Sequence, residues 1–336
     1  MTNDIKRGVS LYSFQNETFL GTMNLEDCIR TCAQMGATGI EIVGEQTFWG
    51  WPEAGVEQAA IDNWHALMKR YGTTPVSHDF MLDYKRYKGR LMPFAEQVAS
   101  VKKDIDFGAR LGMRYVRALV SLDPEVLVAA APHAEAKGLK ILIEVHAPLH
   151  FDHPWIIRHA EAFEKSGSNA LGFLPDMGMF LERIPRIWIE RFIRNGCPRD
   201  AADFVAKAYE DRKLSEYIIG DVLEKWGPGP QVALAETTRH NAAFEPKRML
   251  EFMPRIHNIH GKFYEMTDEM TEYSIPYDKV VAILKQGGYQ GHICSEYEGN
   301  RWIEDAMEVN SVEQVRRQQL MLCRLIGEPV PAALAA

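Results

Sequence analysis

The feature of this sequence that most constrains its fold is a unit that recurs along the chain. Each unit is an amphipathic helical stretch, a glycine, and then a short run of β-branched or aromatic residues. The junctions QMGATGIEIV, RLGMRYVRAL, AKGLKILIEV and QGGYQGHICSEYE all have this form. A glycine after a helix can adopt the left-handed conformation that ends the helix before the next strand. Such alternation is typical of a parallel sheet with helical crossovers.

Eight strands are predicted from these runs, and helical stretches fit between them. The predicted strands span residues 8–14, 39–43, 74–80, 114–120, 140–146, 171–177, 258–264 and 292–298. One predicted helix is capped by Asn24 and ended by Gly36, and another covers residues 95–111 before Gly112. Eight such units favour a closed (β/α)₈ TIM barrel over an open sheet, with residues 1–336 forming one domain.

One stretch departs from this rhythm. About seventy residues separate the sixth and seventh strands, where a single crossover helix would suffice, so residues 181–254 are predicted to be a long helical insertion. It contains a predicted helix around 201–214 and is interrupted by Asn-Gly-Cys-Pro and Gly-Pro-Gly-Pro. Because it leaves the carboxyl end of strand six, we expect a lid over the mouth, a docking surface for another subunit, or a surface decoration. The final residues, 329–336, are predicted to form a frayed tail.

Composition limits the classes of partner. A net charge of −8, from 38 Lys+Arg against 46 Asp+Glu, offers no general attraction for nucleic acid or acidic lipid. No run approaches the ~20 apolar residues that span a bilayer, and no apolar signal region begins the chain. We therefore expect a cytoplasmic protein with neither a nucleic-acid nor a membrane partner. Its five scattered cysteines are interpreted as buried small hydrophobic residues rather than as disulfides or a zinc site.

Four ionisable residues lie at the carboxyl ends of strands that should be apolar throughout. They are Glu144, Asp176, His260 and Glu296, on the predicted strands five, six, seven and eight. In a closed barrel these strands are neighbours, so the four side chains can converge. Carboxylates gathered in a low-dielectric site repel one another unless a cation compensates their charge. Oxygen-rich ligands with a single imidazole suit Mn²⁺, Mg²⁺ or Co²⁺ better than a closed structural zinc site.

The two-residue period of a strand adds candidates to the same face. His146 shares a face with Glu144, and Glu298 shares one with Glu296. A histidine at this position is suited to act as a general base near neutral pH. It could instead be a fifth metal ligand or could support one of the other ligands. Lys262, on the same face as His260, could neutralise an oxyanion or pair with a nearby glutamate.

Other residues are candidates for substrate contacts. His78 and Asp79 at the end of strand three, and Arg117 in strand four, could hold sugar hydroxyls on the other half of the mouth. Trp49 and Trp51, in the loop after strand two, could stack on a sugar or an aromatic ring, or pack locally under the loop.

A divalent ion with open coordination positions suits chemistry at the carbon next to a carbonyl group. Chelation of the carbonyl oxygen and a neighbouring hydroxyl oxygen acidifies the proton on that carbon, and a nearby base can remove it. Return of the proton gives epimerisation or isomerisation, and loss of a β-substituent gives elimination.

The four residues and their spacing resemble the xylose-isomerase-like TIM barrels of the sugar-phosphate isomerase/epimerase superfamily. In its ketose 3-epimerases, the resemblance implies, Glu144, Asp176, His260 and Glu296 would hold one divalent metal, and the two glutamates would also move protons. The substrate-binding positions depart from that pattern. This chain has His150, Met179 and Met266 where the epimerases have a glutamate, a histidine and an arginine. That difference counts against simple epimerisation of a free ketose.

Within the superfamily, the segments GVSLYSF, GIEIVGEQ, HNIHGKFYE and GGYQGHICSEYEG, with Pro-Asp-Xaa-Gly-Xaa-Phe at 175–180, look most like the alpha subunit of the bacterial C-glycoside deglycosidases. This resemblance implies a manganese-dependent enzyme that works with a small β subunit of about 140 residues in a hetero- or homo-oligomer. It would cleave the carbon–carbon bond between a 3-oxo-sugar and an aromatic aglycone by elimination.

The same resemblance implies roles for particular residues. His146 would be the base at sugar C2, the tryptophan loop would face the aglycone, and the insertion would meet the small subunit. The main alternative is a metal-dependent isomerase or epimerase of a keto- or oxo-sugar. An abasic-site endonuclease would need more histidine ligands and a basic surface, and a non-catalytic sugar-binding barrel would contain no metal.

Overall fold

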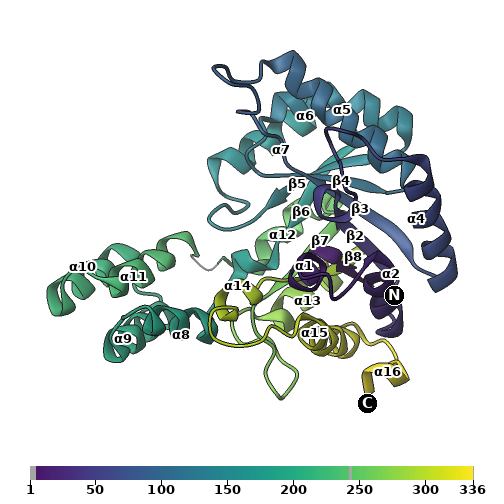
Figure 1. Cartoon of the computed structure of the whole chain (residues 1–336). Helices are drawn as coiled ribbons and strands as arrows, with labels where there is room; N and C mark the ends of the chain where they lie inside the picture. The colour runs from purple at the N-terminus through teal and green to yellow at the C-terminus, as the bar shows by residue number, and fades with distance from the viewer. Residues whose placement is uncertain (1–4, 242–243, 336) are drawn as a thin grey trace.

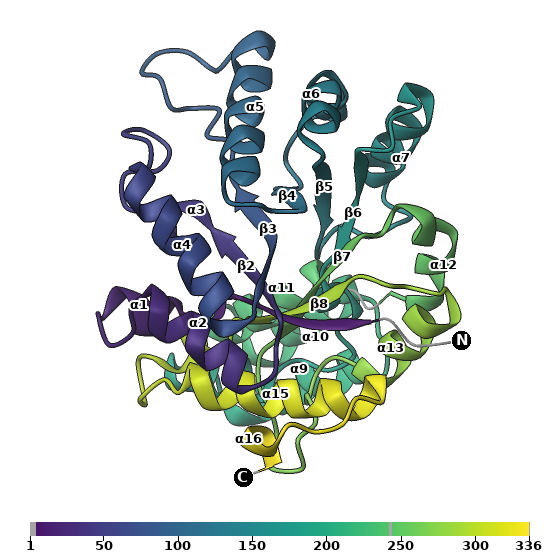
Figure 2. The same ribbon diagram turned by 90° about the vertical axis from the view of Figure 1, so that its right-hand side faces the viewer.

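A computed structural model describes residues 5–241 and 244–335 of the chain. Its centre is a sheet of eight parallel strands with helices around it (Figures 1 and 2). The strands are β1 Lys6–Ser10, β2 Gly39–Val43, β3 Thr74–Phe80, β4 Tyr115–Ala118, β5 Lys140–Val145, β6 Leu171–Pro175, β7 Asn258–Phe263 and β8 His292–Tyr297. Their order is β6-β5-β4-β3-β2-β1-β8-β7, and two parallel bridges, Phe173–Ile256 and Asp176–His260, join its ends. The predicted (β/α)₈ barrel is confirmed.

Helices alternate with the strands and cover the barrel. Outside the segment between β6 and β7 they are α1 Gln15–Phe19, α2 Leu25–Gln34, α3 Gly44–Thr47, α4 Gln58–Tyr71, α5 Phe94–Arg110, α6 Pro124–Lys137, α7 Pro154–Ser166, α13 Tyr277–Gln286, α14 Asn300–Ile303, α15 Ser311–Ile326 and α16 Ala332–Ala335. Asn24 caps α2 through a reciprocal pair of hydrogen bonds with Asp27. Gly36, Gly112 and Gly138 have φ of +72°, +71° and +73°, the left-handed conformation that the sequence predicts after a helix.

The first strand ends earlier than predicted. The sequence predicts a strand over 8–14, but β1 ends at Ser10 and residues Leu11–Phe14 form a 3₁₀ helix. This turn brings the hydroxyl of Ser13 onto β8, where it donates to the Ser295 carbonyl (3.0 Å) and accepts from the Tyr297 amide (3.0 Å). A side chain thus takes over the hydrogen bonding that another two residues of strand would have provided.

The segment between β6 and β7 is helical. It contains α8 Arg186–Arg194, α9 Arg199–Glu210, α10 Ser215–Trp226, α11 Pro230–His240 and α12 Met249–Phe252, with short 3₁₀ turns at Met177–Phe180, Pro246–Arg248 and Met253–Arg255. The helix predicted around 201–214 is α9. In Figure 1, helices α8–α11 extend to the left of the strands. Whether 181–254 is an insertion relative to other barrels stays a prediction.

Helix α8 attaches this segment to the barrel. Trp188 stacks on Trp302 with ring centroids 4.6 Å apart, and it meets Tyr264 edge-on at 4.9 Å. Arg194 and Asp305 form an ion pair of 2.7 Å beside this contact. The segment is therefore tied to the loops that follow β7 and β8, at the carboxyl end of the barrel.

The C-terminal tail is ordered rather than frayed in the part that the structure describes. Residues Ala332–Ala335 form α16, and Leu334 is buried. Its carbonyl oxygen accepts a hydrogen bond from Arg316 of α15 (3.1 Å). In the structure this buried leucine gives the tail, which was predicted to be frayed from residue 329, an apolar anchor. No helix in the described parts of the chain has the length and apolar character needed to cross a bilayer.

Candidate metal centre

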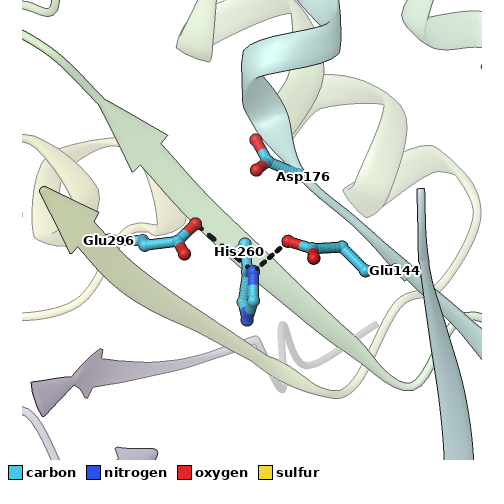
Figure 3. A group of neighbouring side chains, drawn as sticks. All are labelled: Glu144, Asp176, His260 and Glu296. Atoms are coloured by element: carbon cyan, nitrogen blue, oxygen red, sulfur yellow. Dashed lines mark hydrogen bonds and ion pairs between the residues drawn. The ribbon is translucent and has the colours of Figure 1, made fainter. Parts of the chain in front are cut away.

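The four residues singled out at the strand ends come together in the structure. Glu144, Asp176, His260 and Glu296 are all buried, and each offers a ligand atom within 4.8 Å of the others. The Nδ1 atom of His260 lies 2.7 Å from Glu144 Oε1 and 3.3 Å from Glu296 Oε2. Figure 3 shows the three carboxylates arranged around one side of the imidazole ring.

Parallel register explains this convergence. Glu144 lies in β5, His260 in β7 and Glu296 in β8, while Asp176 follows the last residue of β6. The bridge between Asp176 and His260 places β6 and β7 side by side at the level of the site. The Asp176 carboxylate also accepts a hydrogen bond of 2.6 Å from the Gly178 amide, which fixes its direction at the start of the 3₁₀ turn.

The ion-pair network around the site contains more negative than positive groups. Arg117 contacts Asp79 (3.2 Å) and Glu144 (3.6 Å), and Lys262 contacts Asp176 (2.6 Å) and Glu296 (3.5 Å). The network thus contains these two permanent cations and six carboxyl groups, those of Glu41, Asp79, Glu144, Asp176, Glu296 and Glu298. A divalent cation would offset part of the remaining negative charge.

Two of the carboxyl groups are held in the charged form. Burial raises the pKa of Glu144, but Arg117 and His260 outweigh this effect and hold that pKa well below its usual value. Burial also raises the pKa of Glu296, and His260 and Lys262 bring it down to about 2. Both side chains are therefore carboxylates at neutral pH, the form that binds a metal.

The imidazole and the aspartate hold protons more strongly. Burial lowers the pKa of His260, but the carboxylates of Glu296, Glu41 and Glu144 raise it well above its ordinary value. Burial raises the pKa of Asp176 to about 6, although a neighbouring ammonium group opposes the effect. A cation that binds these two side chains must displace protons from them, so its affinity should increase with pH.

The donor set fits a divalent metal. Three carboxylates and one imidazole nitrogen are oxygen-rich ligands of the kind that Mn²⁺ and Mg²⁺ prefer. Glu296 Oε2 is buried and has no hydrogen-bond partner among the described residues, although two charged nitrogens lie 3.3 and 3.5 Å away. A buried carboxylate oxygen of this kind is a group that a metal ion would satisfy.

A cavity of about 350 Å³ opens beside the four residues, and several predicted site residues line it. The predicted residues in the cavity wall are His146, Lys262, Arg117 and Glu298. Tyr12, Met81, Tyr264 and Asn241 also line the cavity. Asn241 follows α11, so the helical segment contributes to the cavity wall.

One ring nitrogen of His146 is held by the neighbouring backbone. Its Nδ1 lies 2.6 Å from the carbonyl oxygen of Ala147. Because a carbonyl oxygen can only accept, Nδ1 is the donor in this contact, and Nε2 is the ring nitrogen that remains for another partner. The side chain lines the cavity, where a bound molecule could meet Nε2.

Three of the residues predicted to contact substrate do not line this cavity. His78 is fully buried and points away from the cavity, with Nε2 3.1 Å from Asp104 Oδ1. Neighbouring residues of a strand face opposite sides, so His78 lies in the helix layer while Asp79 faces into the barrel. Trp51 is buried and stacks on Phe107 at 3.8 Å, which is local packing. Trp49 is 99 % exposed and is not part of the cavity wall.

Two further candidates, Arg117 and Glu298, line the cavity but are engaged by neighbours. Arg117 pairs with two carboxylates, and its Nε is buried without a hydrogen-bond partner among the described residues. Glu298 accepts a hydrogen bond from Tyr12 (3.2 Å) and lies 3.5 Å from Lys262. A substrate hydroxyl group would therefore have to share these side chains with their present partners.

Sequence reasoning missed Glu41, which lies in β2 and has no exposed surface. Its Oε1 lies 2.9 Å from Nε2 of His260, on the side of the ring opposite the four-residue group. A charged residue in the buried run GIEIV is a signal of the same kind as the other four. It was overlooked because it lies in the middle of the strand sequence and not beside the last four strands.

The chain is similar to known proteins in both sequence and structure. Residues 29–318 match the family model described as "Xylose isomerase-like TIM barrel". A curated relative from Arthrobacter globiformis, named C-glycoside deglycosidase alpha subunit, is 29% identical over 311 residues, covering 88% of this chain and 84% of that protein. Another from Microbacterium sp, named 3'-dehydrocarminate deglycosidase alpha subunit, is 28% identical over 339 residues and covers 96% and 95%.

Solved structures share the fold. A sugar phosphate isomerase/epimerase from Parabacteroides distasonis has a TM-score of 0.57 and 14% sequence identity, with 99% of this chain and 96% of that one covered. At this identity the similarity establishes the barrel architecture alone.

Proposed function

The chain belongs to the xylose isomerase-like TIM barrel family, and on that premise we propose that it is an enzyme, the alpha subunit of a metal-dependent C-glycoside deglycosidase. It would cleave the carbon–carbon bond between a 3-oxo-sugar and an aromatic aglycone. The observation that carries this proposal is the convergence of Glu144, Asp176, His260 and Glu296 beside a cavity that also presents His146. The names and extensive coverage of the two curated relatives support the choice of reaction.

Glu144, Asp176, His260 and Glu296 would hold the metal, for which we propose Mn²⁺, with Mg²⁺ or Co²⁺ as alternatives. Bound there, the ion would polarise the 3-oxo group and the neighbouring 2-hydroxyl group of the sugar and so acidify the proton at C2. Lys262 lies among the same carboxylates and would neutralise negative charge that develops on oxygen.

His146 is the proposed base. Its unprotonated Nε2 would take the proton from sugar C2, and the bond from C1 to the aromatic ring would then break. The electron pair of that bond goes to the ring carbon, which takes up a proton. A carbon–carbon double bond remains between C1 and C2 of the sugar. Arg117 and Glu298, on the cavity wall, would hold sugar hydroxyl groups during this step.

A partner subunit belongs to the proposal because both curated relatives are named alpha subunits. We propose a small β subunit of about 140 residues that docks on the helical segment α8–α11. Leu214, Tyr217 and Leu223 are exposed apolar residues at or on α10, and Asn241 at the end of α11 reaches the cavity wall. We place this assembly in the cytoplasm, where buried free cysteines such as Cys28 and Cys32 stay reduced.

The test is incubation of the protein with a 3-oxo-C-glucoside of a flavonoid, with each candidate small subunit added. We expect release of the free aglycone with Mn²⁺, detected by liquid chromatography, and loss of that release with EDTA. Restoration by added Mn²⁺ would show that the chelator acts through the metal. Intact glycoside in every arm, from protein that has bound the metal, would contradict the proposed reaction.

A second candidate is an isomerase or epimerase of a keto- or oxo-sugar. The paired carboxylates Glu144 and Glu296 on one cavity favour it, because they suit proton transfer on two faces of a substrate. Met179 and Met266 are buried and offer no hydrogen-bond donor to a sugar, which counts against it. Incubation of the free 3-oxo-sugar in D₂O separates the two reactions. Epimerisation would give a new sugar stereoisomer that carries deuterium, whereas a sugar-binding barrel without catalysis would give neither product.

A further inference from the structure

We propose that Glu41 is a positioning residue for metal binding. In this inference, the Glu41 carboxylate accepts the proton of Nε2 of His260 and so keeps Nδ1 unprotonated toward the metal. The inference rests on the metal centre of the proposed function. It assigns a task to a buried carboxylate that neither lines the cavity nor belongs to the four-residue group.

The His260 ring has carboxylates on both of its nitrogens. Nδ1 faces Glu144 and Glu296, and Figure 3 shows the second ring nitrogen pointing away from them. That second nitrogen, Nε2, lies 2.9 Å from Glu41 Oε1. Both side chains are fully buried, and neither atom forms a hydrogen bond with a described residue. At 2.9 Å the two atoms are within hydrogen-bonding distance of each other but are not aligned as a hydrogen bond.

The chemistry of imidazole makes this pairing consequential. A neutral imidazole carries one proton, and a nitrogen that binds a metal must be the other one. A proton on Nδ1 would donate to Glu144 Oε1, 2.7 Å away, and would compete with the metal for that nitrogen. An acceptor at Nε2 therefore selects the tautomer that can bind metal.

Asp79 is the only other carboxylate near Nε2 among the described residues, and its oxygens are already engaged. Its Oδ2 lies 3.4 Å from Nε2 but accepts from Arg117 (3.2 Å), and its Oδ1 accepts from Ser77 (2.9 Å). Glu41 is closer, and no Arg or Lys in the described parts of the chain forms an ion pair with it. Glu41 is thus the stronger acceptor for the imidazole proton.

Asn258 orients the Glu41 carboxylate. Its Nδ2 donates to Glu41 Oε2 at 2.7 Å, so Oε1 is the oxygen left for His260. Asn258 lies two residues before His260 in β7 and therefore faces the same side of the barrel. This contact suggests a reciprocal pair of variants as a test.

The variant Glu41→Gln replaces one oxygen by an amide donor. Because Asn258 already donates to this group, the glutamine oxygen would turn toward Asn258 and its NH₂ would face Nε2. That arrangement favours the wrong tautomer, and we expect the Kd for Mn²⁺, measured by titration calorimetry, to increase about 10- to 100-fold.

The double variant Glu41→Gln with Asn258→Asp reverses the donor and acceptor on this contact. The aspartate introduced at position 258 would accept from the glutamine NH₂ and turn the glutamine oxygen back toward Nε2, so we expect most of the affinity to return. Glu45→Gln is the matched control, since it removes the same charge from an exposed residue of α3, just after β2. Thermal unfolding of each variant checks that the barrel is intact.

Several results would overturn the inference. One is that Glu41→Gln binds Mn²⁺ as tightly as Glu45→Gln does, and another is that the double variant binds no better than Glu41→Gln. Two bound ions per wild-type chain would instead make Glu41, Asp79 and His260 a second cation site. If wild type and Asp176→Asn bind Mn²⁺ equally, the proposed metal centre itself fails, which is a different outcome.

A measurement on the wild-type protein covers the case in which a variant does not fold. Long-range ¹⁵N–¹H NMR of histidine-labelled protein loaded with Mg²⁺ reports which ring nitrogen carries the proton. We expect the proton of His260 on Nε2, and a proton on Nδ1 in the loaded protein would overturn the inference.

Discussion

At the scale of single residues, the site is governed by competition between protons and a cation for the same ligand atoms. The carboxylates around His260 raise its pKa well above the usual value, and burial raises the pKa of Asp176 to about 6. Lowering the pH through about 6 protonates Asp176 and adds to the protons that the metal must displace. Metal affinity should therefore fall as the pH falls and rise as it rises.

We predict from this that Mn²⁺ binds at least about tenfold more weakly near pH 5.5 than near pH 7.5. Titration calorimetry in two buffers of different ionisation enthalpy checks the prediction and counts the protons released. Affinity that is independent of pH, with no proton release, would show that the ion does not bind these side chains.

His146 leads to a second prediction at this scale. Since Nδ1 donates to the Ala147 carbonyl, His146→Gln should keep the fold but lose the basic nitrogen at Nε2. We expect turnover of a 3-oxo-C-glucoside to fall by about 10² to 10⁴, with the Kd for Mn²⁺ unchanged. If the variant turns over substrate as fast as the wild type, His146 is not the base. If the variant loses metal binding, His146 is a metal ligand instead.

Residue identity predicted the four convergent side chains because charged groups are rare in parallel strands that are buried on both sides. The direction of each side chain was harder to predict. A buried strand such as TPVSHDF is polar on both faces, so its sequence does not reveal that His78 turns outward to Asp104. Glu41 was missed for a related reason, since its partner His260 lies on a strand that is distant in sequence.

At the scale of elements, the loop after β2 shows how local packing competes with function. Its two tryptophans lie close in sequence, but Trp51 stacks on Phe107 in the core and Trp49 is almost completely exposed. Sequence alone does not distinguish them, because both follow an aromatic or glycine residue in a loop without a regular period.

The two tryptophans therefore provide a matched pair of variants. Trp51→Ala leaves a cavity beneath the loop and should lower the free energy of unfolding by about 3 to 5 kcal/mol. Trp49→Ala removes an exposed ring and should change it by less than about 0.5 kcal/mol. Urea denaturation measures both. Equal effects of the two substitutions would contradict the assigned packing.

The ends of helices were predicted best where the sequence has a glycine that can adopt positive φ or a side chain that can cap the helix. Gly112 and Gly138 end helices because each adopts positive φ, and Asn24 caps α2 with its own side chain. The end of β1 was predicted too late, because a serine hydroxyl that bonds to β8 has no signature in the local sequence. Buried Leu334 likewise anchors a tail whose composition is typical of a frayed end.

At the scale of the whole molecule, the candidate ligands come from four neighbouring strands, and two of them lie where the barrel closes. Between β6 and β7 the described residues form two isolated bridges rather than a continuous ladder, and one of these joins Asp176 and His260. A metal bound to both residues would tie this junction together. We propose that the whole chain then unfolds as one unit.

We predict that Mn²⁺ at about one hundred times its Kd stabilises the folded protein by about 2.7 kcal/mol. Scanning calorimetry should show a single transition that moves to higher temperature with Mn²⁺. The Asp176→Asn variant should show no such movement at the same Mn²⁺ concentration. A second transition whose temperature does not change with Mn²⁺ would indicate that residues 181–254 unfold separately.

The barrel itself could be predicted from the sequence because its pattern repeats eight times, and each repeat reports on the same architecture. The arrangement of the 181–254 segment could not be predicted, because it occurs once and its position depends on contacts such as Trp188 with Trp302. The proposed docking of a small subunit on this segment likewise depends on contacts that the sequence of this chain does not reveal, and testing it requires the partner protein.

The central claim is that Glu144, Asp176, His260 and Glu296 bind one divalent ion. The most direct test is anomalous diffraction from crystals grown with Mn²⁺. The account predicts one strong anomalous peak per chain at this site, within bonding distance of Nδ1 of His260 and of an oxygen of each carboxylate. No peak there in crystals of protein saturated with Mn²⁺, or a peak bound by other residues, would contradict it.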